Sequence, residues 1–253
     1  MNGIGVIVLA AGQGTRMKSD IPKVLHHLGG TPLFLHVLRA AQQLEPSRIA
    51  VIVGHGAAAV QQAYSAENLC WAIQEKQLGT AHAVLCAEPT FHGFTGDVLI
   101  LSGDVPLIRE DTLKRLFDQH HRQQAAVTLL TANLEDPKGY GRIVRDDKQQ
   151  ITRTIEEKDA SDLQKQIREV NAGIYVAAAP FLFSALSRVN DQNRQREYYL
   201  PDIVAIAVRE HRTVANLHLD DAREMMGINT REELARMEKS LQEEINRKWM
   251  AQG

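Results

Sequence analysis

A continuous apolar run, Gly5 to Ala10, ends directly in a glycine-rich loop, and this run constrains the fold more strongly than any other feature of the sequence. Strands of a parallel sheet that helices cover on both faces have such unbroken apolar sequences. Similar runs lie at 49–53 and 97–102, and stretches with helical spacing separate them. Strands and helices that alternate at short intervals predict βαβ units.

The sequence therefore predicts an α/β fold with a Rossmann-like, mostly parallel central sheet and helices on both faces. The second half of the chain changes character, because Arg142–Arg145, Ile151–Ile155 and Val170–Ala177 have strand patterns without long helices between them. We expect these three strands to form a small antiparallel addition that covers one end of the sheet.

Two helix starts are marked in the sequence. Thr31-Pro32 precedes a stretch of helical spacing, and proline is favoured at the first helical position. Thr230 and Glu233 match a capping box, which predicts a last helix with apolar residues at helical spacing from Leu234 onward.

The composition excludes several classes of function. The chain has 253 residues and a formal net charge of -2, so it has no global attraction for nucleic acid or an anionic membrane. The first apolar run is shorter than the about 20 residues that span a bilayer. Cys70 and Cys86 are too few for a disulfide framework, which favours a reducing cytosol. We expect a cytoplasmic protein without a nucleic-acid or membrane partner.

The glycine-rich loop after the first strand is a candidate phosphate site. Glycines let the backbone approach a ligand closely and turn amide N–H groups outward. Arg16 and Lys23 follow and supply positive charge where it builds up on a transferring phosphoryl group. A tight turn is the alternative for the glycines alone. Met17 replaces the third glycine of the dinucleotide fingerprint, which disfavours a dehydrogenase.

Asp104 follows the apolar run 97–102 through Gly103. A carboxylate just past the carboxyl end of a central strand lies where open α/β sheets bind ligands. Mg²⁺ requires only one or two carboxylates beside substrate phosphates. Asp104 is therefore a candidate metal ligand, and a Gly-Asp turn is the alternative.

Other polar residues are weaker candidates. Gln74 has an amide that could recognise a pyrimidine edge, whereas Gly79-Thr80 could simply start a helix. Asn229 is either a metal ligand or part of a helix entry. Candidates for contacts with sugar hydroxyls are Gly141, Glu156, Asn171 and Tyr199. The histidines show no metal-binding spacing, and the pairs His26-His27 and His120-His121 are expected to be exposed.

Together the motifs resemble the sugar nucleotidyltransferases, and in particular the uridylyltransferase half of the bacterial bifunctional N-acetylglucosamine-1-phosphate uridylyltransferases. The resemblance extends from about Ile4 to Asn229. The matching segments are Leu9–Met17, Pro22–His26, Gln77–Thr80, Gly103–Leu107, Gly139–Ile143, Glu197–Tyr199 and Gly227–Asn229.

The resemblance implies that UMP is transferred from UTP to N-acetylglucosamine-1-phosphate with Mg²⁺ as cofactor, which yields pyrophosphate and a precursor of peptidoglycan and lipopolysaccharide. It implies that Arg16, Lys23 and Asp104 are catalytic and that Asp104 and Asn229 bind Mg²⁺. The implied substrate contacts are Leu9, Ala10, Ala11, Gly12, Lys23, Gln74, Gly79, Thr80, Ser102, Gly103, Asp104, Gly141, Glu156, Asn171, Tyr199 and Asn229.

The sequence also departs from that family. Ala81 stands where a glycine is expected, and Ser102 stands where a tyrosine is often found. The family's second half, a left-handed β-helix with an acetyltransferase and a trimer interface, has no counterpart here. We expect a nucleotidyltransferase domain at 1–229 and a helix at 230–253 that links to such a β-helix in a longer protein, although a naturally short enzyme is the alternative. A homotrimer is expected only with that second half.

Two other functions stay open. A nucleotidyltransferase for another nucleotide and sugar phosphate would share the same loop, and only the resemblance at 77–80, Glu156 and Asn171 disfavours it. A non-catalytic nucleotide sensor would not need both cations and both candidate metal ligands.

Overall fold

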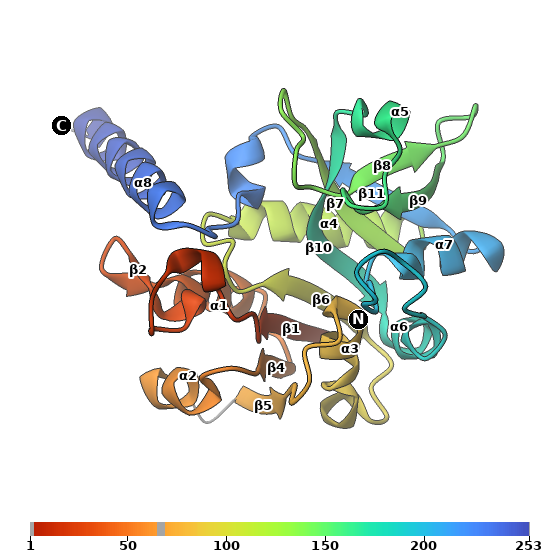
Figure 1. Cartoon of the computed structure of the whole chain (residues 1–253), viewed down its shortest axis with the longest axis horizontal. Helices are drawn as coiled ribbons and strands as arrows, with labels where there is room; N and C mark the ends of the chain where they lie inside the picture. Colours follow the sequence, from red (N-terminus) through yellow and green to blue (C-terminus); the bar gives the residue numbers. More distant parts are fainter. Residues whose placement is uncertain (1–2, 65–68, 253) are drawn as a thin grey trace.

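The computed structural model describes residues 3–64 and 69–252, so residues 1–2 and 253 at the ends of the two predicted units lie outside the described residues. The central sheet contains β1 Ile4–Ala10, β4 Arg48–Val53, β5 Leu69–Ile73, β6 Asp97–Ser102, β7 Val127–Asn133, β8 Arg142–Arg145, β9 Ile151–Ile155, β10 Glu169–Ala178 and β11 Val214–His218. Its main path has the order β11-β7-β10-β6-β1-β4-β5 (Figure 1). A separate hairpin consists of β2 His27–Leu28 and β3 Thr31–Pro32.

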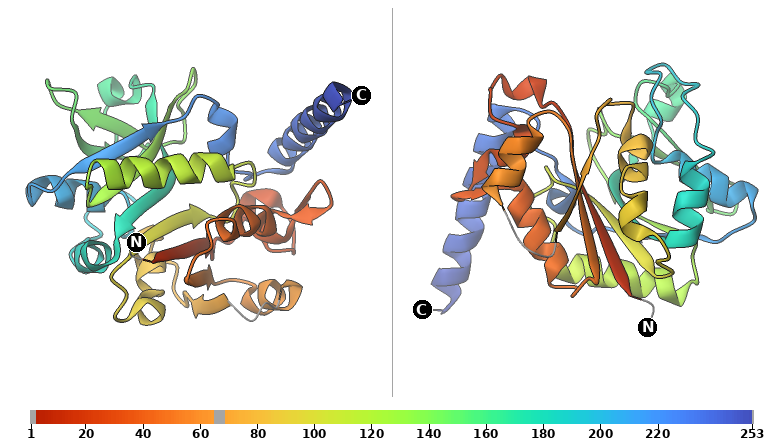
Figure 2. Two further views of the ribbon diagram at one scale, coloured as in Figure 1. Left: turned by 180° about the vertical axis from the view of Figure 1, so that it is seen from behind. Right: turned by 90° about the horizontal axis from the view of Figure 1, so that it is seen from below.

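Helices cover both faces of this sheet (Figure 2). The α-helices are α1 Leu33–Gln42, α2 Ala57–Ala63, α3 Thr80–Leu85, α4 Glu110–Arg122, α5 Asp162–Lys165, α6 Ala179–Leu186, α7 Asp202–Arg209 and α8 Arg231–Gln252. The 3-10 helices are η1 Thr15–Met17, η2 Lys23–Leu25, η3 Glu88–Phe91 and η4 Ala222–Met225. Val6 and Val8 of β1 pack with α1, α2 and α4, whereas Ile7 packs with α3, α6 and α7. The predicted fold class is confirmed.

The direction in which the chain crosses the sheet reverses at β1. Strand β1 pairs in parallel with β4 on one side and with β6 on the other, and β5 extends the sheet beyond β4 before the chain returns to β6. Open α/β sheets form a ligand crevice outside the carboxyl ends of strands at such a reversal. Here the two loops touch, because Gly103 N–H donates to Leu9 O at 2.8 Å.

Strand β10 lies inside the main sheet, so the prediction that Val170–Ala177 belongs to a peripheral addition is wrong. β10 is antiparallel to both β6 and β7, and only the β8–β9 hairpin forms the addition. Ile174 and Val176 are buried on one face and Tyr175 and Ala177 on the other. The chain returns through turns and this hairpin without a long crossover helix, which is how antiparallel neighbours are joined.

Both predicted helix starts lie close to an observed one. Thr31 and Pro32 form β3, and α1 begins at Leu33, so proline precedes the helix with extended backbone. The capping box is confirmed at α8, because Glu233 N–H donates to Thr230 Oγ1 and Thr230 N–H donates to Glu233 Oε2, each at 3.1 Å.

The last helix, α8, projects from the body in Figure 1. The side chain of Met237 near its start packs with Leu28, Leu33 and Ile228. The boundary at 229/230 stays a prediction. Among the described residues, no helix has the length and apolar character needed to cross a membrane.

Asp97 at the start of β6 connects the sheet to α4. Contrary to prediction, His120 is buried; its Nδ1 lies 2.8 Å from Thr128 Oγ1 and its Nε2 lies 3.4 Å from Asp97 Oδ1. His121 Nε2 lies 2.8 Å from Asp97 Oδ2. Burial raises the pKa of Asp97, but hydrogen bonds from the two imidazoles outweigh it, so the pKa lies below its usual value.

We expect Asp97→Asn to lower the free energy of unfolding by about 1 kcal/mol at pH 7, because hydrogen bonds to a charged group are lost. A carboxyl with a lowered pKa stabilises the folded state above its unfolded pKa, and this contribution is lost as the pH falls through the folded pKa. In urea denaturation, the gap between wild type and variant should therefore close as the pH falls from about 5 toward about 2. A gap that does not depend on pH would contradict this role.

Candidate active site

The glycine-rich loop after β1 packs directly on Lys23. Gly14 has a left-handed φ of 63°, and a Cβ at this position would lie 2.5 Å from Lys23 Cβ. A larger residue would therefore strain the backbone and displace Lys23. Because Arg16 lies in η1 and Lys23 in η2, the loop brings both cations to the carboxyl end of β1.

Four predicted residues converge beside this loop. Lys23 Nζ donates to Asp104 Oδ2, and it donates to Asn229 Oδ1 at 3.1 Å. Arg16 donates from its guanidinium to the same Asn229 oxygen at 2.9 Å. The side chains of Lys23 and Asp104 are only 14% and 18% exposed, so solvent screens their ion pair less than it screens a surface pair. The structure thus joins two cations, a carboxylate and an amide in one network.

The start of α8 positions Asn229. Asn229 N–H donates to Glu233 Oε2 at 2.6 Å, so this residue is part of the helix entry as well as of the network. Arg231 donates from Nε to the carbonyl of Met17 at 3.0 Å, which fixes α8 to η1. Both interpretations of Asn229 from the sequence are therefore compatible with its position.

A hollow of about 270 Å³ opens next to the network. It is lined by Leu9, Ala10, Ala11, Gly12, Lys23, Val24, Gln74, Gln77, Gly79, Thr80, Ala83, Ser102, Asp104 and Glu197. Most of the residues that the sequence assigned to the nucleotide therefore share one surface at the carboxyl ends of β1 and β6.

Amide side chains brace the walls of this hollow. The buried Gln74 donates to the carbonyl of Gly79 at 3.0 Å, and Gln77 donates to the carbonyl of Ala11 at 2.8 Å. Thr80 Oγ1 accepts from Leu200 N–H at 2.9 Å, so the start of α3 is also a tertiary contact. The sequence marks Gln77 only as part of a motif, and no local pattern indicates its contact with the glycine-rich loop.

Residues predicted for the sugar lie along β10 and the end of β9. Asn171 donates from Nδ2 to the Tyr175 hydroxyl at 2.5 Å, and its Oδ1 accepts from Gly173 N–H at 3.1 Å. Its own N–H donates to the carbonyl of Gly141 at 2.9 Å. A Cβ on Gly141 would lie 3.2 Å from Glu156 Oε1, so these predicted residues are neighbours. Sequence reasoning missed Tyr175, because this residue lies within a mostly apolar stretch of sequence.

Glu156 and Tyr199 line a second hollow of about 480 Å³, together with Asp159 and Asp202. Burial raises the pKa of Glu156, and the carboxylates of Asp159 and Asp202 raise it further. The Tyr199 hydroxyl donates to Asp159 Oδ2 at 3.1 Å, and burial raises the pKa of Tyr199 to about 12. Tyr199 is thus hydrogen-bonded within this second hollow.

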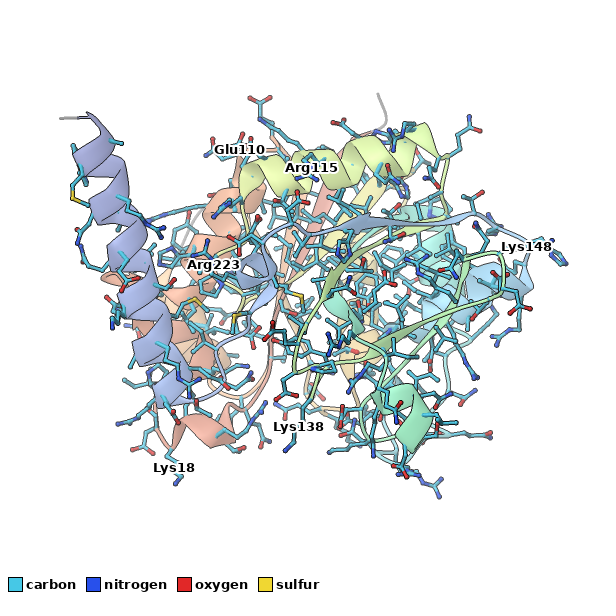
Figure 3. The ribbon with its side chains drawn as sticks, turned by 90° about the horizontal axis from the view of Figure 1, so that it is seen from above. Lys18, Glu110, Arg115, Lys138, Lys148 and Arg223 are labelled. Atoms are coloured by element: carbon cyan, nitrogen blue, oxygen red, sulfur yellow. The ribbon has the colours of Figure 1, made fainter. Side chains whose placement is uncertain are left out.

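A third hollow of about 520 Å³ lies between α8 and the loop before β8. Arg16 and Asn229 line it, and so do the further cations Lys138, Arg223 and Arg236. Figure 3 shows Lys18 and Lys138 along the same edge of the molecule and Arg223 beside α8. Cations therefore lie on the outer side of the network together with carboxylates, because Glu233 also lines this hollow and Arg223 is paired with Asp221.

We expect Tyr175→Phe to lower the free energy of unfolding by about 1–3 kcal/mol, because a buried amide donor of Asn171 loses its partner. Urea denaturation measures the change. Tyr64→Phe is the matched control, since the Tyr64 hydroxyl has no hydrogen bond with any residue that the structure describes. Equal stability of the two variants would show that the Asn171–Tyr175 bond contributes little.

The family model for the MobA-like NTP transferase domain matches residues 6–250 of this chain. "Bifunctional protein GlmU" of Syntrophotalea carbinolica is 47% identical over 250 residues, which cover 99% of this chain and 54% of that protein. The protein of the same name from Pseudomonas syringae pv. syringae is also 47% identical over 250 residues, with the same two shares. The chain thus spans about half the length of these relatives.

Solved structures share the fold. A UDP-glucose pyrophosphorylase complexed with UDP-glucose has a TM-score of 0.76 at 15% identity and covers 95% of this chain and 98% of its own. A Bacillus anthracis protein assigned as a glucose-1-phosphate thymidylyltransferase, in complex with a sucrose, has a TM-score of 0.72 at 18% identity. The match covers 93% of this chain and 94% of that protein chain.

Proposed function

Because the chain belongs to the family of MobA-like NTP transferase domains, we propose that it transfers UMP from UTP to N-acetylglucosamine-1-phosphate. The products would be UDP-N-acetylglucosamine, a precursor of peptidoglycan and lipopolysaccharide, and pyrophosphate. The observation that carries the proposal is the network of Arg16, Lys23, Asp104 and Asn229 beside the hollow of about 270 Å³. The ordered motifs shared with the bifunctional uridylyltransferases support the choice of substrates.

Enzymes of this family generally use a divalent metal, and we propose Mg²⁺. Asp104 Oδ2 and Asn229 Oδ1 both accept from the one ammonium group of Lys23, so a single cation position reaches both oxygens. Carboxylate and amide oxygens suit Mg²⁺, which takes its further ligands from substrate phosphates and water. When bound, the ion would supply charge neutralisation on the nucleotide phosphates.

In the proposed reaction, an oxygen of the sugar phosphate attacks the α-phosphorus of UTP in line with the leaving pyrophosphate. Arg16 and Lys23 would stabilise the charge on the transferring group, and the amides of the glycine-rich loop would bind the phosphate oxygens. Positioning and charge stabilisation supply most of the catalysis in phosphoryl transfer, so no covalent intermediate with the protein is needed.

The two substrates would occupy different parts of the site. The nucleotide contacts would come from Leu9, Ala10, Ala11, Gly12, Gln74, Gly79, Thr80, Ser102 and Gly103. The sugar contacts would come from Gly141, Glu156, Asn171 and Tyr199. The hydrogen bonds that fix both polar atoms of the Asn171 amide support its use in recognition, because a fixed amide presents one orientation.

We also propose a cytoplasmic protein whose partners are these two small molecules. The free cysteines Cys70 and Cys86 support this location, and the net charge of -2 gives no global attraction to nucleic acid or an anionic membrane.

The direct test is release of pyrophosphate with UTP and N-acetylglucosamine-1-phosphate, with Mg²⁺ or with a chelator, beside panels of other nucleotides and sugar phosphates. We expect release only with this pair and Mg²⁺. Asp104→Asn should fold normally and reduce turnover by about two orders of magnitude or more, because it weakens the charge that holds the metal. Release of pyrophosphate with another pair would overturn the substrate assignment. No release with any pair from folded protein would favour a nucleotide sensor.

Asn171→Ala should raise the KM for N-acetylglucosamine-1-phosphate by about tenfold, because the sugar loses one hydrogen bond to an uncharged amide. The KM for UTP should stay within about twofold, because Asn171 is not among the proposed nucleotide contacts. Steady-state kinetics with each substrate varied in turn measures the two values. Asn133→Ala, at the exposed end of β7, serves as the control with both values unchanged. A parallel rise of both KM values would contradict the assignment of Asn171 to the sugar.

A further inference from the structure

The two oxygens proposed for the metal already accept hydrogen bonds from the chain's own cations. Asp104 Oδ2 accepts from Lys23 Nζ, and Asn229 Oδ1 accepts from Lys23 Nζ at 3.1 Å and from Arg16 at 2.9 Å. Lys23 and Arg16 are also the two residues proposed to bind phosphate. Each of these cations therefore has two competing anionic or polar partners within the proposed reaction.

We propose that Lys23 and Arg16 occupy the oxygens of Asp104 and Asn229 as resident cations and are exchanged when the metal and the nucleotide bind. Asp104 and Asn229 would then hold the metal through these oxygens, and the released cations would turn to the phosphate oxygens. This inference rests on the proposed function. It adds that metal and triphosphate bind cooperatively, because each provides a partner for the groups that the other displaces.

The charges of the network explain why the metal does not displace the two cations efficiently unless the triphosphate binds as well. Arg16, Lys23 and Asp104 together carry a net charge of +1, from two cations and one carboxylate. A divalent cation that arrives alone must displace an ammonium group from its carboxylate while both positive side chains stay nearby, which like-charge repulsion disfavours. A triphosphate supplies the anionic oxygens that the displaced cations need.

The location of Lys23 permits this exchange. Its Cβ packs against Gly14, so the base of the side chain is anchored on the glycine-rich loop that faces the proposed phosphates. The ammonium group sits at the end of a flexible four-carbon chain and has three donors. Rotation near the end of the side chain can therefore move the charge without movement of the backbone.

The test is the affinity for Mn²⁺, followed by the electron paramagnetic resonance signal of the free ion, in protein without nucleotide. Lys23→Met keeps the length of the side chain and removes its charge, and we expect it to bind Mn²⁺ about tenfold more tightly than wild type, because the competing ion pair is lost. Lys23→Arg keeps the charge and should not gain affinity. Lys138→Met removes a cation that lines the third hollow without a hydrogen bond to either oxygen, and its affinity should stay within about twofold.

A second arm adds a UTP analogue with a methylene group between the α- and β-phosphorus atoms. Wild type should gain much more Mn²⁺ affinity from the analogue than Lys23→Met does, because coupling between two ligands is reciprocal and the variant has lost the group that is exchanged. Lys23→Gln replaces Lys23→Met if circular dichroism shows that the latter is unfolded.

Unchanged or weaker Mn²⁺ binding by the folded, uncharged variants would overturn the inference while leaving the proposed reaction intact, provided that wild type binds Mn²⁺ with the analogue and releases pyrophosphate. Tightening in Lys138→Met equal to that in Lys23→Met would also overturn it, because net charge alone would then explain the effect. Mn²⁺ binding to none of the proteins, with or without the analogue, would overturn both the exchange and the proposed metal site.

Discussion

The parallel pairing of β1 with β6 is the constraint on which the site depends. It places the loop after Ala10 beside the loop before Asp104, and the hydrogen bond from Gly103 N–H to Leu9 O keeps the two loops in contact. The chain adds β4 and β5 on one side of β1 before it returns to form β6 on the other, so β1 lies between β4 and β6. The glycine-rich loop and the carboxylate of Asp104 thus become neighbours through topology although they are far apart in the sequence.

Local sequence was sufficient where burial and turn chemistry decide the structure. The bounds of the strand at 97–102 and the capping box at Thr230 follow from an apolar run and from a side chain that satisfies free backbone groups. The sequence identifies Asp104 because it follows Gly103 at the end of a buried strand, and it identifies Lys23 because its positive charge follows the glycine-rich loop. The fold class and the residues at the centre of the candidate site can therefore be predicted from the sequence.

The rest depended on contacts that no local pattern shows. The sequence predicts the antiparallel direction of β10 but not its place between β6 and β7, because an apolar run does not show which strands lie beside it. His120 is polar but buried, because Thr128 and Asp97 provide partners that no local pattern reveals. The role of Tyr175 is hidden too, since its hydroxyl meets Asn171 of the same strand where the pairing of β10 with β7 shifts in register.

The hydrogen bond between Arg16 and Asn229 joins residues that are 213 positions apart. A growing polypeptide on the ribosome would complete β1, its glycine-rich loop and Asp104 long before Asn229 is synthesised. Until then, Lys23 and Arg16 lack one of the oxygens that hold them, and α8 cannot fix η1. The order of synthesis therefore makes the Asn229 amide the last member of the network to arrive, so a partly made chain can contain Lys23, Arg16 and Asp104 but lacks the oxygen that Lys23 and Arg16 share.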